Sequence, residues 1–487
     1  MEEESSPSTI PLIAQVVESF ITSVESLADT FPLAMKTIAD SQAKIGDEML
    51  TSLMSLAHEF LEFHHVGINR DEMTHFLEGL SEEERKKIFD GKGQEILERF
   101  FNVLQKMLND VSWMKSSSQR LPSITEYLRK KLENGRKMLI ANKLVRQSFI
   151  ISLISQYDAF LGELIRALFL IKPETLNVSE RNISFSQLRE FNTMDDAREY
   201  IMGKEIESVL RGSHIEQFKW LENKYGLELR KGLTVWPTFV EVTERRNLFT
   251  HSSGVVSGQY LDVCREHEVQ LAQEVRIGTE LDVTTDYFEL AYECIFEIGV
   301  KLAHVLWRKV APQDLEDADV NLNAICFNLL LKRQYKLACI LLDFATETLK
   351  KYSDDNNRRI YIINRAQAYK WAGEDEKAKM IVKSADWSAS SDRFKLAEAV
   401  LLDDFGKADY LVRKIGSQGD IKMFDYREWP LFREYRKTEG FLKAFEEVFN
   451  ESFYSEKDLF FAIDWLKDMK GSGSGTTPLT AEIGGEA

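Results

Sequence analysis

The stretch that decides the fold is IANKLVRQSFIISLISQYDAFLGELIRALF, residues 140–169. More than half of its residues are apolar, which over this length predicts a helix that is buried on most sides. The polar residues Ser152, Ser155 and Asp158 recur at intervals of three and share one stripe of that helix. Asp158 is therefore predicted to have a partner, because a lone buried carboxylate is costly.

Further helices surround this one. Polar helices are predicted near 195–211 and 215–225, and an apolar helix over 287–307. Between them, VWPTFVEVTERRNLFTH (235–251) should form a helix with Thr234 as its cap, Pro237 in its first turn, and its end at the Ser-Ser-Gly that follows. Four main helices between about 140 and 310 predict a four-helix bundle.

The composition argues against β-rich folds. The 487-residue chain is 44% apolar with 30 Phe, enough for sizeable cores, but it holds only 25 Gly and 9 Pro. A barrel or sandwich would need turn residues about every 8–12 positions. An all-α fold follows, and roughly 100–200 residues per domain predicts three domains.

Charge divides the chain near Gln119. The net charge is −17, so contact with RNA needs a local basic surface. Residues 120–148 hold eight Lys or Arg against two Glu, whereas residues 1–119 hold ten against 21 Asp or Glu. We therefore predict an acidic helical domain at 1–118 and a second domain at 119–312. The basic stretch either faces RNA or is an ordinary exposed helix, and its RNA-binding candidates are Lys130, Lys131, Arg136 and Lys137.

Beyond residue 319 the pattern changes to helical pairs. In NRAQAYKWAGEDEKAKMIVKSA (364–385), Ala368 and Ala378 flank a turn at Gly373, and small residues there let two antiparallel helices approach closely. The segment resembles a tetratricopeptide repeat (TPR). Weaker copies place further alanines at 338 and 408, so residues 320–470 are predicted to be a degenerate repeat module that binds a protein partner or trigger. Residues 471–487 have the composition of a disordered linker.

No feature of the chain predicts secretion, a membrane or a cofactor. Its four Cys show no paired spacing, its N-terminus is acidic where a signal peptide is basic, and no uncharged apolar run approaches 18 residues. We therefore expect a cytoplasmic protein. His58, Glu62 and His65 could share a helical face and bind a metal, but without a second ligand cluster a solvated face is the simpler interpretation.

The segment that carries chemistry is EVTERRNLFTH, residues 241–251. Cleaving RNA without a metal needs a base, an acid and a fixed cation for the phosphorane. His251 can serve as base or acid near neutral pH, and Arg246 offers bidentate donors to phosphate. Asn247 lies four residues before His251 on one helical face, so its amide can orient the imidazole or contact phosphate. Arg246 and His251 lie about 140° apart around a helix, so they converge only if the helix unwinds or a partner subunit completes the site.

Two segments together resemble a known superfamily. SLISQYDAFLGELIRALF (152–169) and FVEVTERRNLFTHSSGVV (239–256) are similar to the two core helices of the HEPN superfamily, whose ribonucleases carry an Arg-polar-x(3–5)-His motif and an acid on a preceding helix. The resemblance covers about 170 of the 487 residues. It assigns Arg246, Asn247 and His251 to the motif and Asp158 to the acid, and Arg245 beside them is a further candidate for RNA binding.

What the resemblance implies is a metal-independent endoribonuclease, usually a dimer whose two Arg/His motifs meet in one cleft. Many such proteins act as toxins in anti-phage or toxin–antitoxin defence. Toxins that nucleotidyl-transferase antitoxins silence carry a Tyr two residues after the motif His, and the chain has Ser253 there. That mode of control is therefore not expected.

Other interpretations stay open at this point. Spacing alone proves little, because Arg70 and His75 repeat it by chance. The motif could be an ordinary helix end with a His favoured by the dipole and an Arg in a surface ion pair. The whole chain could then be a non-catalytic scaffold, or a nucleotide sensor, although no Gly-rich phosphate loop supports a sensor.

Overall fold

The computed structural model is all-helical, as predicted. It describes residues 11–63, 121–177 and 183–454, and for part of these, Lys131 included, the backbone alone. Within these ranges no strand occurs beyond a single isolated bridge between Val255 and Glu280. The chain divides into two compact units, Met1–Asp314 and Leu315–Ala487. The division lies at the predicted boundary between 312 and 320.

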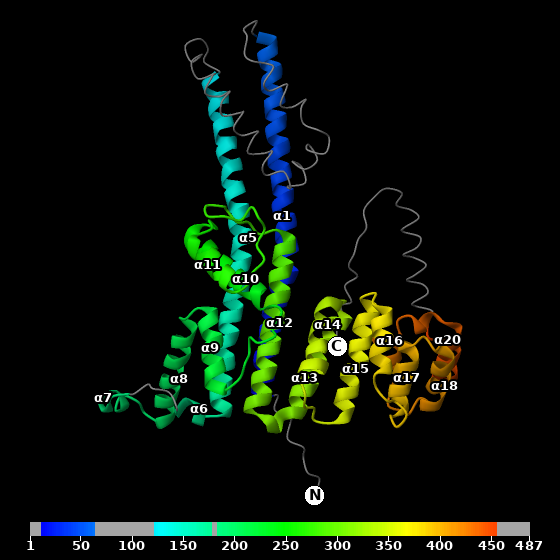
Figure 1. Cartoon of the computed structure of the whole chain (residues 1–487). Helices are drawn as coiled ribbons and strands as arrows, with labels where there is room; N and C mark the ends of the chain where they lie inside the picture. Colours follow the sequence, from blue (N-terminus) through cyan, green and yellow to red (C-terminus); the bar gives the residue numbers. More distant parts are fainter. Residues whose placement is uncertain (1–10, 64–120, 178–182, 455–487) are drawn as a thin grey trace. The chain divides into compact units, whose positions relative to one another are not determined.

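Four helices form the core of the first unit. The long helices α1 (Leu12–Phe63) and α5 (Leu121–Ile171) run side by side, and α12 (Thr285–Val310) packs against both (Figure 1). The fourth helix, α10 (Trp236–Ser252), packs against α5 and α12. Shorter helices lie around this bundle: α6 (Glu174–Asn177), α7 (Phe185–Leu188), α8 (Met194–Leu210), α9 (His214–Tyr225), α11 (Gly258–Glu266) and the 3₁₀ turn η2 (Pro312–Asp314).

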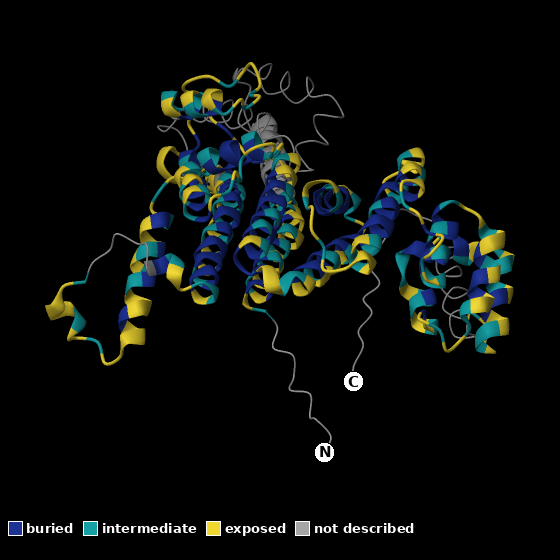
Figure 2. Cartoon of the chain, turned by 60° about the horizontal axis from the view of Figure 1, so that its bottom comes forward, coloured by how far each residue is buried: buried dark blue, intermediate teal, exposed yellow. Residues whose placement is uncertain are grey.

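The predicted buried helix at 140–169 is confirmed as part of α5. Leu153, Tyr157 and Leu161 have no exposed surface, and Figure 2 shows buried residues along the inner faces of the bundle helices. Within the described residues, the Glu133–Ile171 part of α5 alone is long and apolar enough to span a membrane. That test uses length and composition only, and the core helix of a soluble protein passes it too.

The N-terminal helix does not belong to a separate domain. In α1, Val17, Phe20 and Val24 are buried at helical spacing, because α5 and α12 cover this apolar stripe. Phe20 lies 4.3 Å from the Phe160 ring of α5, centroid to centroid. The predicted boundary at 118–119 is therefore wrong for residues 12–41, which complete the four-helix bundle. The rest of the predicted acidic domain, residues 64–118, lies outside the described residues.

Gly299 of α12 lies where α1 packs tightly against that helix. A Cβ placed on Gly299 would lie 2.2 Å from the ring of Phe20, which is itself buried. We expect Gly299→Ala to lower the free energy of unfolding by about 1–3 kcal/mol through overpacking. Urea unfolding measures this, with Gly203→Ala of α8, where the new Cβ meets nothing within 4 Å, as the control. Equal stability of Gly299→Ala and wild type would mean that α1 does not pack here.

The second unit consists of successive helical pairs, as the sequence predicted. Each pair begins with α13 (Leu315–Leu331), α15 (Asp355–Trp371) or α17 (Asp392–Leu401), and neighbouring first helices pack together. The remaining elements are α14 (Tyr335–Asp343), the π-helical turn η3 (Phe344–Thr348), α16 (Asp375–Lys383), α18 (Phe405–Ile415), α19 (Met423–Glu428), the 3₁₀ turns η4 (Pro430–Phe432) and η5 (Tyr435–Lys437), and α20 (Glu439–Phe449).

Small residues allow the helices of a pair to approach, as expected. The side chains of Ala338, Ala368, Ala378 and Ala408 have no exposed surface, and Gly373 makes the turn between α15 and α16 with a φ of +89°, which favours glycine. The likeness to tetratricopeptide repeats remains a prediction. The predicted disordered tail at 471–487 lies outside the described residues.

Candidate functional site

The candidate motif lies on α10, which is helical throughout. Pro237 lies in the first turn as predicted, but the cap predicted at Thr234 is wrong, because Val235 precedes the helix and makes no side-chain cap bond. The helix ends where Ser253 and Gly254 turn left-handed, with φ of 51° and 85°. A Cβ on Gly254 would lie 2.9 Å from a backbone carbonyl oxygen, so only glycine fits this turn.

The structure brings two of the predicted site residues together. Asp158 of α5 accepts a hydrogen bond from the Arg246 Nη2 of α10, with 3.2 Å between Nη2 and Oδ2. The side chains of Asp158 and Arg246 are 31% and 23% exposed, so solvent reaches the ion pair. Both residues lie on helices of the bundle, which fixes their backbones. The partner that the sequence required for Asp158 is therefore the motif arginine itself.

A third residue, His214, completes this cluster and was missed in the sequence. Its Nε2 lies 2.9 Å from Asp158 Oδ1, and its side chain is 7% exposed. His214 is the first residue of α9, directly after Ser213, whose hydroxyl caps that helix. The only sequence signal was this cap, Ser-x-x-Glu, which places the residue after Ser at a helix start.

Arg246 has donors beyond the one that bonds to Asp158. Its Nε is buried and has no hydrogen-bond partner among the described residues. A guanidinium carries five N–H donors and the bond to Asp158 uses one of them, so the partly exposed end of the side chain keeps donors for an incoming oxygen acceptor. Arginine forks of this kind suit phosphate.

His251 and Asn247 do not join this cluster within one chain. His251 is exposed, and α10 stays helical past it, so the unwinding that would turn it toward Arg246 does not occur. The amide of Asn247 donates to Glu244 Oε1 at 3.4 Å instead of orienting the imidazole. Of the two ways to unite His251 with Arg246, only a second subunit remains.

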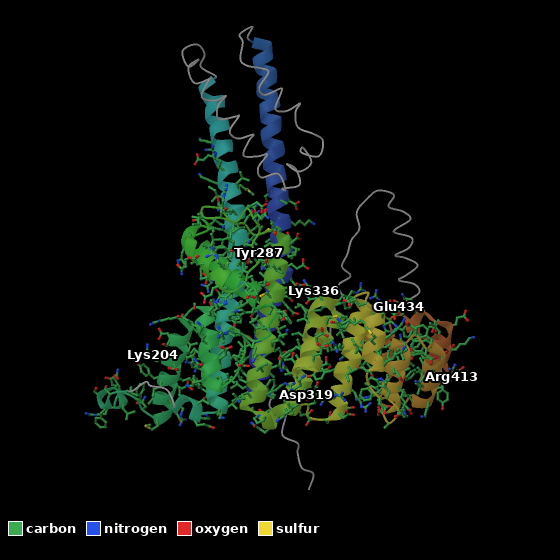
Figure 3. The ribbon with its side chains drawn as sticks, viewed as in Figure 1. Lys204, Tyr287, Asp319, Lys336, Arg413 and Glu434 are labelled. Atoms are coloured by element: carbon green, nitrogen blue, oxygen red, sulfur yellow. The ribbon has the colours of Figure 1, made fainter. Side chains whose placement is uncertain are left out.

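Arg245 belongs to a different, buried cluster. Its Nε donates to Glu241 Oε1 at 2.6 Å, and its guanidinium lies 3.8 Å from the ring centre of Tyr287, which Figure 3 labels. Glu241 also accepts from the hydroxyls of Tyr260 and Tyr287, each at 2.8 Å. Burial opposes the charge of Arg245, but the nearby Tyr287 and Glu241 outweigh it and raise its pKa. The structure thus holds Arg245 in a mostly buried ion pair, and its predicted role in RNA binding stays a prediction.

The basic stretch is exposed where it is described. Lys130, Arg136 and Lys137 lie on the outer surface of α5, and Lys137 pairs with Glu133 at 2.6 Å. Further along α5, Arg146 is occupied by a two-fold contact with Asp282. The side chain of Lys131 lies outside the described residues. The predicted RNA-binding surface therefore remains a prediction that rests on Lys130, Arg136 and Lys137.

Metal-ligand clusters and reactive cysteines would be other sources of chemistry in the part of the chain that the structure describes. No group of three or more His, Cys, Asp or Glu there is arranged to hold a metal, and the candidate set at 58, 62 and 65 lies outside the described side chains. All four cysteines are buried. Burial raises the pKa of the Cys264 thiol to about 11, which makes it a poor nucleophile.

The cluster of Asp158, His214 and Arg246 is the candidate site that the geometry offers. A comparison with known protein families, curated proteins and solved structures found no match to this chain.

Proposed function

We propose that the first unit is a metal-independent endoribonuclease of the toxin or anti-phage defence type, which acts as a homodimer. The observation that carries the proposal is the ion pair between Asp158 and Arg246. The resemblance assigns the acid of one helix and the arginine of another to a common site, and these residues, 88 positions apart, are in contact and partly exposed.

The proposed reaction is transesterification of RNA. His251 acts as general base and takes the proton of the ribose 2′-hydroxyl, whose oxygen attacks the adjacent phosphorus. Arg246 donates to the phosphorane oxygens and stabilises their charge. The 5′-oxygen leaves with the proton that the His251 imidazolium returns to it as general acid, so the imidazole ends neutral, and the other product is a 2′,3′-cyclic phosphate. Asn247 positions the imidazole when substrate displaces its bond to Glu244.

The geometry of α10 supports the proposed dimer. Arg246 faces α5, whereas His251 is exposed beyond it, so the imidazole of one copy is free to meet the guanidinium of another. Basic residues of α5 then guide RNA, and the helical pairs of the second unit bind a protein partner or trigger. Such arrays stack into extended surfaces that suit this role.

Replacement of His251 tests the proposal. We expect His251→Ala to cut RNA cleavage about 10²–10⁴-fold, because a general acid–base is lost. Cleavage of labelled RNA by purified protein measures this, together with growth arrest on expression. Ser252→Ala, an exposed neighbour on the same helix, is the control. Equal cleavage by His251→Ala and wild type would contradict the proposed enzyme and favour the alternative of a non-catalytic scaffold.

A further inference from the structure

We infer that His214 is a positioning residue, which holds one oxygen of Asp158 so that the other oxygen faces Arg246. The contact geometry stands by itself, and only the effect on catalysis rests on the proposed function. His214 is no part of the motif that the resemblance covers, because it lies on α9 between the two matching segments.

The two oxygens of Asp158 have separate partners. Oδ1 lies 2.9 Å from His214 Nε2, and Oδ2 lies 3.2 Å from Arg246 Nη2. The terminal torsion of an aspartate is broad, so one partner alone leaves the carboxylate free to rotate. A second partner on the other oxygen fixes its plane. His214 therefore decides where Oδ2 points.

The fold holds His214 firmly in place. It follows Ser213, whose hydroxyl accepts from the Glu216 amide while the Glu216 carboxylate accepts from the Ser213 amide. The imidazole packs between the rings of Tyr157 and Phe239, with ring centres 5.9 and 5.7 Å away. At 7% exposure it is too buried to touch RNA, so it acts through Asp158.

Arg246 depends on this arrangement. The bond to Asp158 is the one hydrogen bond that its side chain makes among the described residues, and its buried Nε has no partner. Once the carboxylate turns away, no other described group holds the guanidinium. The effect of His214 thus reaches the cation that would stabilise the phosphorane.

The test compares His214→Leu with His214→Gln. The amide nitrogen of Gln can donate to Asp158 as Nε2 does, whereas Leu fills the space without a donor. Modification of Arg246 by a dicarbonyl reagent, followed by mass spectrometry, reports how firmly it is held. We expect His214→Leu to raise the rate of Arg246 modification roughly tenfold, the size of effect that loss of an outer-shell partner has. His214→Gln should leave that rate near the wild-type value. Arg245, held by Glu241, is the internal control for unfolding.

RNA cleavage gives the second measurement. We expect kcat to fall about 10–100-fold in His214→Leu with KM little changed, and to recover in His214→Gln. An unchanged rate of Arg246 modification in His214→Leu would overturn the inference. An equal rise of that rate in His214→Gln and His214→Leu would overturn it too. If the wild-type protein cleaves no RNA, only the proposed function is contradicted. The rates of Arg246 modification would still decide whether His214 positions Asp158.

Discussion

Heterodimers that carry Arg246→Ala in one subunit and His251→Ala in the other are expected to cleave RNA at about half the wild-type rate, since a two-fold dimer keeps one of two sites intact. Each homodimeric variant should retain about 1% or less, because loss of a transition-state donor costs roughly 10²–10³-fold in kcat. The reason is the course of α10, which remains helical to Ser252 and keeps the two side chains of one chain apart.

Co-expression with two different tags and purification through both isolates the heterodimer. Its cleavage rate is then compared with that of the two homodimers at equal concentration. If one chain supplied both groups, every site in the heterodimer would lack one of them, and activity would stay as low as in the homodimers. That outcome would contradict the shared site. Arg246→Lys is a useful companion, because lysine keeps the charge and loses the bidentate geometry.

Glu241→Ala should destabilise the first unit more than any other change proposed for it, by about 3–5 kcal/mol, the cost of breaking a buried ion pair from one side. Glu241 is 6% exposed and accepts hydrogen bonds from Arg245, Tyr260 and Tyr287, which lie on α10, α11 and α12. Its loss leaves the Arg245 charge buried without a counter-ion and two hydroxyls without an acceptor.

Urea unfolding followed by circular dichroism measures this loss as a lower midpoint at constant slope. Glu241→Gln should cost less, because an amide oxygen still accepts from a tyrosine. The matched control is Glu244→Ala, one turn along α10, where the described bond to Asn247 is long and partly exposed, so we expect a change within about 0.5 kcal/mol. Equal midpoints for Glu241→Ala and Glu244→Ala would show that the buried cluster does not stabilise the unit.

The sequence by itself predicted the main helices and the need of Asp158 for a partner. Apolar periodicity carries the information for a helix locally, so α5 and the pairs of the second unit could be predicted from composition and small residues alone. Asp158 in an apolar helix was predicted to be buried and to need a partner. The structure leaves its side chain 31% exposed, and the arginine of the motif on α10 is one of its partners.

Only the tertiary structure decided which helices share a core. The acidic charge of residues 1–119 suggested a separate domain, but charge lies on outer faces, whereas packing depends on the inner stripe of Val17, Phe20 and Val24. Neighbouring Arg245 and Arg246 looked equivalent in sequence, yet they lie about 100° apart on α10 and meet different carboxylates. The place of His214 beside Asp158 depends on how α9 packs, and a contact across 56 residues leaves no local trace in a sequence.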